Sequence, residues 1–103
     1  MAKRIANVIV DSPIREPLDY LVPADIEIQV GQRCLVPLGT RKVVGIVVGF
    51  SEESRFSKLR EVISRVDDIA PLSFGWLALT SFAARYYQSG WGQVAIPALP
   101  KFF

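Results

Sequence analysis

The first residue whose type and position could do chemistry is an aspartate inside a short apolar segment. Asp19 lies between Leu18 and Tyr20 in the segment 17–23. An ionised carboxylate in such a strand is costly unless it faces water or accepts hydrogen bonds. Strand alternation places Leu18 and Tyr20 on one face and Asp19 on the other. We therefore expect Asp19 either to accept a hydrogen bond from a ligand, such as a sugar hydroxyl or a base amino group, or to cap a local turn.

A second group of functional residue types lies in the segment 55–60, where Arg55, Lys58 and Arg60 flank the aromatic ring of Phe56. Single-stranded nucleic-acid sites combine cations for the phosphates with rings for the bases. The same composition is typical of a solvated loop whose ring is buried. The segment is therefore a candidate nucleic-acid contact, with a solvated loop as the simpler interpretation.

A third group follows a proline–glycine corner. Gly39 ends the Pro37-Leu38-Gly39 corner, and Arg41 and Lys42 come directly after it. Glycine has no side chain to keep a ligand away from the backbone. Arg41, Lys42 and Lys58 are thus expected to act as auxiliary phosphate contacts or to form a solvated surface.

Several common catalytic motifs are missing from the sequence. It contains no histidine and one cysteine, which leaves no Ser–His or Cys–His pair and at most one thiolate for zinc. No phosphate-binding glycine loop of the nucleotide-hydrolase type occurs. We expect no enzyme activity, metal or cofactor in this chain. The cysteine, Cys34, is expected to be a buried apolar residue in a reducing, cytoplasmic setting.

Length and charge limit the class of protein further. The 103 residues suit one domain, and the net charge of +2 suits contact with only a few phosphates. No apolar run approaches the ~20 residues that a membrane-spanning helix needs, so we expect no membrane insertion.

The elements that must position these residues are mostly strands. Alternation and turn residues predict strands over 5–10, 18–22, 32–36, 43–50 and 60–66. Ser73 is expected to cap a helix that runs to about Gln88, and 91–99 is expected to be extended. The sequence therefore predicts a mostly β, small barrel-like domain with one C-terminal α-helix. Its β part covers about 1–68, and its helix and tail cover about 70–103.

The apolar residues of this helix lie on more than one face. One predicted face contains Leu72, Trp76, Leu79, Ala83 and Tyr86, and a second contains Phe74, Leu77 and Phe82. A small barrel can hardly cover both faces. We therefore expect the second face to dock on the rest of a longer protein, unless the final segment folds back over it.

Several short segments of the chain, taken in order, resemble a known family. The segments 18–23, 31–39, 45–48, 85–87 and 98–100 are similar to the N-terminal domain of the bacterial replication-restart helicase PriA, over nearly the whole chain. The resemblance implies a domain that binds the 3′ end of the nascent leading strand at a stalled fork. It also implies that the parent protein is an ATP-dependent helicase that binds zinc. The partners of this domain would then be the helicase core of the same polypeptide and other primosome proteins.

The resemblance assigns a pocket for the 3′-terminal nucleotide residue by residue. The Phe-Asp-Tyr segment of the family corresponds to Leu18, Asp19 and Tyr20, so the first ring is absent here. The pocket glycine corresponds to Gly39, and a family lysine corresponds to Arg60, which keeps the charge but changes the hydrogen-bond geometry. Two other interpretations remain open: an SH3-like protein-interaction barrel and a structural domain without a ligand.

Overall fold

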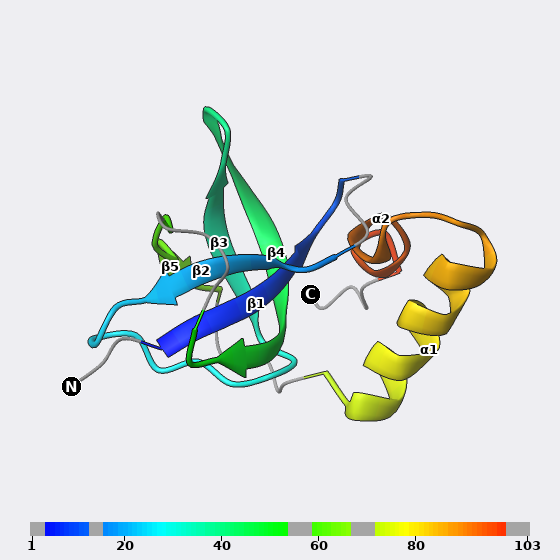
Figure 1. The fold of residues 1–103 in the computed structure, drawn as a ribbon, viewed down its shortest axis with the longest axis horizontal. Helices are drawn as coiled ribbons and strands as arrows, with labels where there is room; N and C mark the ends of the chain where they lie inside the picture. Colours follow the sequence, from blue (N-terminus) through cyan, green and yellow to red (C-terminus); the bar gives the residue numbers. More distant parts are fainter. Residues whose placement is uncertain (1–3, 13–15, 54–58, 67–71, 99–103) are drawn as a thin grey trace.

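A computed structural model describes residues 4–12, 16–53, 59–66 and 72–98. Five antiparallel strands form one sheet in the order β2-β1-β4-β3-β5, and two helices follow at one end of the molecule (Figure 1). The elements are β1 Arg4–Val10, β2 Leu18–Val22, β3 Arg33–Leu38, β4 Arg41–Ser51, β5 Ser64–Arg65, α1 Phe74–Tyr86 and α2 Trp91–Ala95. The prediction of a mostly β domain with a helical C-terminal part is confirmed.

The sheet curls until its two edges approach each other. On one edge, the backbone of Leu21 in β2 donates to Arg60 O at 2.9 Å and accepts from Val62 N at 2.9 Å. Arg60 and Val62 belong to the segment that leads into β5 on the other edge. This contact is one isolated bridge, between Leu21 and Glu61. The sheet is therefore curled, as the barrel-like prediction required, without being closed into a barrel.

The two faces of the sheet bury different groups of residues. The inner face packs the main core, whose fully buried side chains include Val8, Val36 and Val47. The outer face packs Ile9 and Ile46 of the sheet against α1 and α2. The helices thus cover one part of the sheet and leave the hairpin between β3 and β4 free of them (Figure 1).

A register shift in β4 changes which of its residues face the core. Simple alternation along 43–50 would place Val48 and Phe50 on one face, together with Val44 and Ile46. In the structure, Asn7 pairs with Gly49 and Val8 pairs with Val47, so that Val48 is bulged out of the ladder. Phe50 therefore packs with the main core, whereas Val48 packs with the outer group. Phe50 departs from simple alternation because a bulge adds one residue to one strand and reverses the alternation beyond it.

The hairpin between β3 and β4 is tighter than expected. Both strands extend further toward the turn than the predicted ranges 32–36 and 43–50, and only Gly39 and Thr40 remain as the turn. Gly39 has a φ of 62°, a left-handed conformation that glycine adopts without strain. The fifth strand is shorter than the predicted 60–66, since regular pairing with β3 covers only Ser64 and Arg65.

The start of α1 is confirmed, and the prediction for the segment after it was wrong. The Ser73 side chain accepts from Trp76 N at 3.0 Å, as an N-cap does. The segment predicted to be extended, 91–99, instead contains α2. Gly90 N donates to the Gln93 side chain at 3.1 Å, which satisfies a donor at the start of this short helix.

The buried face of α1 also differs from the prediction. Its buried residues are Leu77, Thr80 and Ala84, whereas Leu79 and Tyr86 of the predicted core face are 65% and 73% exposed. The reason is the position of α2, because the Trp91 ring nitrogen donates to the Thr80 hydroxyl at 3.0 Å. In the part of the chain that the structure describes, no helix is long and apolar enough to cross a membrane.

Candidate nucleic-acid interface

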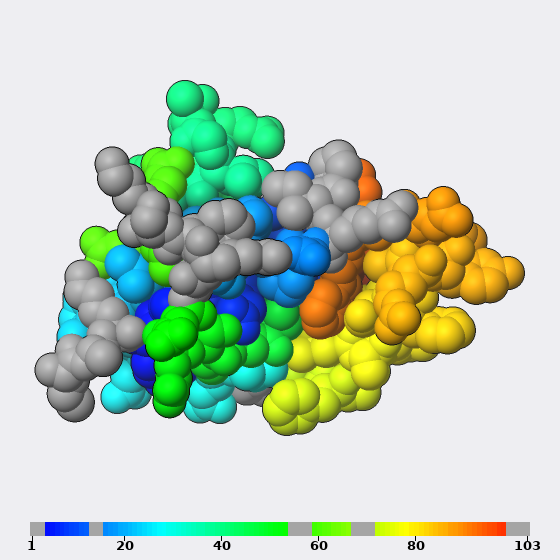
Figure 2. Space-filling view, in the orientation of Figure 1, coloured from blue at the N-terminus to red at the C-terminus, as the bar shows by residue number. Residues whose placement is uncertain are grey.

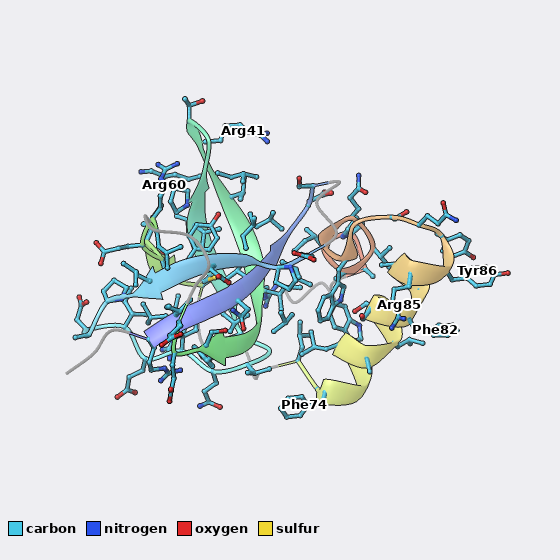
Figure 3. The ribbon with its side chains drawn as sticks, in the orientation of Figure 1. Arg41, Arg60, Phe74, Phe82, Arg85 and Tyr86 are labelled. Carbon is cyan, nitrogen blue, oxygen red and sulfur yellow. The ribbon has the colours of Figure 1, made fainter. Side chains whose placement is uncertain are left out.

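The hairpin turn and the segment that leads into β5 enclose an open groove of about 470 Å³, which we call the hairpin groove. Arg60 reaches across it, and its Nη1 atom donates to Gly39 O at 2.7 Å. Arg41 and Lys42 follow the turn and are exposed. Figure 3 shows Arg41 and Arg60 at the same end of the molecule. The groove is lined by Pro37, Gly39, Thr40, Arg41, Lys42, Leu59, Arg60, Glu61 and Ile63.

Tyr20 supports this groove from inside the sheet. Its side chain is buried in the main core, and its hydroxyl donates to Pro37 O at 2.7 Å. Burial raises the pKa of the Tyr20 phenol above its ordinary value, and the nearby charge of Arg60 partly offsets that effect. Tyr20 therefore holds the carbonyl of Pro37, and Arg60 holds the carbonyl of Gly39. The two bonds fix the end of β3 and the turn that follows.

Asp19 points to the opposite side of β2 and lies in a second, smaller depression. This recess of about 320 Å³ is lined by Asn7, Glu16, Pro17, Asp19 and Val48, and we call it the carboxylate recess. Asn7 pairs with Asp19 across the strands, and its Nδ2 atom donates to Asp19 Oδ1 at 3.0 Å. The bond fixes one carboxylate oxygen in a recess whose two acidic side chains favour a hydrogen-bond donor over a phosphate.

The predicted site residues thus divide between two surfaces. Gly39, Arg41, Lys42 and Arg60 come together in the hairpin groove, whereas Asp19 lies in the carboxylate recess. Leu18 is half-buried and packs against the main core, as Tyr20 does on the same face. Lys58 lies outside the described residues.

One backbone bridge connects the two surfaces. Leu21, which bonds the carbonyl of Arg60, is two residues after Asp19 along β2. Two residues of a strand span about 7 Å, so the Asp19 backbone lies about that far along β2 from the backbone that contacts Arg60.

Sequence reasoning missed Asn7 and Ser51. Asn7 Nδ2 also contacts the Ser51 hydroxyl at 3.1 Å, so both residues support the orientation of Asp19. The available signal was that Asn7 alternates with Ile5 and Ile9 in an otherwise apolar strand. A polar side chain at such a position needs a partner, but the sequence did not show which one.

The charges of the hairpin groove favour an anion. Three cations, Arg41, Lys42 and Arg60, line it with one carboxylate, Glu61. Guanidinium groups match phosphate geometry, and exposed cations attract the nucleic-acid backbone. Among the described residues, no group of three or more Cys, Asp or Glu side chains is placed to hold a metal ion.

The comparisons with known proteins agree with a nucleic-acid-binding module. A model of the 3′DNA-binding domain (3′BD) family matches residues 7–100, and the chain belongs to this family. The chain is 38% identical over 102 residues to the replication restart protein PriA of Haemophilus influenzae, covering 94% of the chain and 14% of that protein. The resemblance inferred from the sequence is confirmed.

Two further relatives carry the same name. The PriA protein of Rickettsia felis is 31% identical over 97 residues, covering 94% of this chain and 15% of that protein. The PriA protein of Buchnera aphidicola (subsp. Schizaphis graminum) is 29% identical over 100 residues, covering 95% and 14%. The chain therefore spans only about one seventh of the length of these relatives, as the coverage shows.

Proposed function

We propose that this domain binds a DNA strand by its 3′-terminal nucleotide and selects a free 3′-hydroxyl. The chain belongs to a 3′DNA-binding domain family, which supports DNA as the ligand. The observation that carries the finer proposal is the position of the two surfaces. Arg60 of the cationic hairpin groove bonds the backbone of Leu21, two residues along β2 from Asp19 of the carboxylate recess.

In this proposal the carboxylate of Asp19 distinguishes the two chemical forms of a strand end. A hydroxyl can donate a hydrogen bond to it, whereas a terminal phosphate is repelled. Two unit charges ~4 Å apart at an effective dielectric of ~20 interact by roughly 4 kcal/mol before relaxation and screening by salt. Asn7 holds one oxygen of Asp19, so the carboxylate meets the strand end in one orientation.

The hairpin groove supplies the attraction for the backbone. Arg60, Arg41 and Lys42 contact the phosphate that leads to the terminal nucleotide, and the exposed glycine of the turn leaves the backbone open to it. A side-chain atom added at Gly39 would meet nothing within 4 Å, so this side of the turn is open. A few contacts are enough because only the end of one strand is held.

In a full-length protein, we propose that this domain is the recognition module of a replication-restart helicase at a stalled fork. It would then act together with the helicase core of the same polypeptide and with other primosome proteins. ATP and zinc would serve the remainder of that protein, and the present domain would contribute binding alone.

The test is fluorescence anisotropy with short single strands that end in a 3′-hydroxyl, in a 3′-phosphate or in a blocked 3′ carbon. We expect the hydroxyl strand to bind most tightly. Asp19→Asn keeps the shape of the side chain and removes its charge. It should weaken binding to the hydroxyl strand by ~1–3 kcal/mol, the range for a hydrogen bond to a charged group, and reduce discrimination against phosphate.

Circular dichroism of Asp19→Asn provides the control, since the fold should be unchanged. Equal affinity of the wild-type domain for hydroxyl and phosphate ends would contradict the proposal. A sharp fall in the melting temperature of the variant would show that Asp19 is a structural cap. An SH3-like protein-binding domain would show no dependence on the 3′ group.

A further inference from the structure

A second cationic cavity lies beside the loop that follows β2. It has a volume of about 470 Å³, and we call it the arginine cavity. Arg65 Nη1 donates to Glu27 O at 3.2 Å, and Arg4 Nη2 donates to Ile28 O at 3.0 Å. The two guanidinium groups are thus anchored on neighbouring residues of one loop, and both line the same cavity. The cavity is lined by Arg4, Val22, Pro23, Ala24, Ile26, Glu27, Ile28, Gln29, Gln32 and Arg65.

The arginine cavity is a built feature rather than two loose side chains. The guanidinium of Arg4 lies 3.9 Å from the centre of the Phe50 ring, which fixes its plane. Arg65 belongs to β5, which pairs with β3. A guanidinium has five N–H donors, so one bond to a carbonyl does not exhaust its capacity to contact an anion. Pre-organised cations of this kind bind phosphate at a lower cost in side-chain entropy.

A middle concavity connects the arginine cavity with the hairpin groove. It is formed by residues 24–27 and 63–65, and it shares Ile63 with the hairpin groove and Arg65 with the arginine cavity. The connection follows β5, at the edge of the sheet away from α1 (Figure 1). The three hollows therefore follow one another from Arg60 to Arg4 through shared lining residues.

The side chains along this path suit a single strand of nucleic acid. Arg60, Arg65 and Arg4 provide cations along it, and Ile63 is 40% exposed between the first two. An exposed apolar side chain can contact the face of a base. Asp25 and Glu27 border the middle concavity from the loop side and repel phosphate, which leaves the β5 side for the backbone.

We infer that the DNA strand leading to the bound 3′ end runs from the hairpin groove past Ile63 into the arginine cavity. Arg65 and Arg4 there contact phosphates upstream of the terminal nucleotide. This inference rests on the proposed function for the position of the strand end. It adds a second subsite, which only oligonucleotides longer than the terminal nucleotides reach.

The test compares a dinucleotide with an oligonucleotide of about eight residues, a length in the range that small β domains cover. In the wild-type domain, the longer strand should bind more tightly and depend more steeply on salt. Arg65→Gln should lower its affinity about five-fold and reduce the salt slope by about one unit. Dinucleotide binding should not change. Arg65→Lys keeps the charge and should retain most of the slope.

Arg85→Gln is the matched control, because Arg85 is an exposed arginine of α1 at the other end of the molecule (Figure 3). It makes the same change of charge and should affect neither ligand. An equal loss for both lengths with Arg65→Gln, or no loss for either, would overturn the inference. If no strand binds preferentially by its 3′-hydroxyl end, the proposed function fails instead, and the effect of length still tests the path.

Discussion

The hairpin end of the domain presents cations and hydrogen-bonding groups, whereas the outer face of α1 presents large apolar side chains. Arg41, Lys42 and Arg60 line the hairpin groove. The outer α1 face is formed by Phe74, Leu79, Phe82, Tyr86 and Tyr87, which are 65–76% exposed, and the helix contains a single charged residue, Arg85. The two surfaces occupy different ends of the molecule (Figures 2 and 3).

This difference indicates that the two ends meet different kinds of partner. The groove is held by buried or long-range hydrogen bonds, such as those of Tyr20 and Arg60, and suits a small anionic ligand. The α1 face has no such bonds and suits an apolar surface. The expectation that an apolar face of this helix docks on the rest of a longer protein stays a prediction. The exposed face differs from the predicted one, because Leu77 is buried.

The largest expected effect concerns the close packing of α2 against β1, which connects the two ends of the molecule. A side-chain carbon at Gly92 of α2 would meet Val10 O of β1 at 1.5 Å. Gly92→Ala should therefore destabilise the domain by about 3 kcal/mol or more, because backbone atoms must move apart. Chemical denaturation measures the loss.

The control for Gly92→Ala is Gly75→Ala, in the first turn of α1. The added carbon would lie 3.8 Å from the Ser73 hydroxyl, an ordinary contact, so stability should rise slightly or stay constant. DNA affinity of folded Gly92→Ala should equal that of the wild type. A parallel loss of DNA affinity would show that the helical end shapes the groove.

The next effect concerns the support of the groove by Tyr20. Tyr20→Phe should cost about 1 kcal/mol at neutral pH, since Pro37 O loses its partner. Burial raises the pKa of the phenol above 10.0, so the unfolded chain ionises first as the pH rises. The stabilising contribution of the protonated phenol is complete below pH 10.0 and is lost above it.

Urea denaturation of wild type and Tyr20→Phe at pH about 8 and about 11 tests this sign. Between these two pH values, the free energy of unfolding of Tyr20→Phe should fall less than that of the wild type. Burial also raises the pKa of the Cys34 thiol, from 9.0 to about 12, but this contribution is common to both proteins. Equal decreases in stability would show that Tyr20 does not titrate differently in the folded state.

Local patterns predicted those features that depend on neighbouring residues. The bounds of β2, the cap at Ser73 and the opposite faces of Asp19 and Tyr20 all follow from alternation or capping preference. The bulge at Val48 has no such signal, because a period of two looks the same on both sides of it. Contacts such as Arg60 with Gly39 join residues 21 apart and arise only when the sheet curls.

A smaller effect is expected for Arg60. Arg60→Ala should lower affinity by about 1 kcal/mol or less for every terminal base, and reduce the salt slope by less than about one unit, because an exposed guanidinium contributes charge rather than base selection. Titrations with four oligonucleotides that differ in the last base measure this, with Arg85→Ala as the unaffected comparison. A loss confined to one base would assign Arg60 to base readout.

The smallest effect on folding is expected at the α1 face. Phe82 is 68% exposed, so Phe82→Ser should change the unfolding free energy by no more than about 0.5 kcal/mol. Leu77→Ser on the buried face of the same helix is the matched comparison and should cost about 2–5 kcal/mol. If the apolar face drives association, sedimentation of the wild-type domain should show self-association that Phe82→Ser weakens, with DNA affinity unchanged. A wild-type domain that stays monomeric at high concentration, or a variant as unstable as Leu77→Ser, would contradict a free apolar surface at this end.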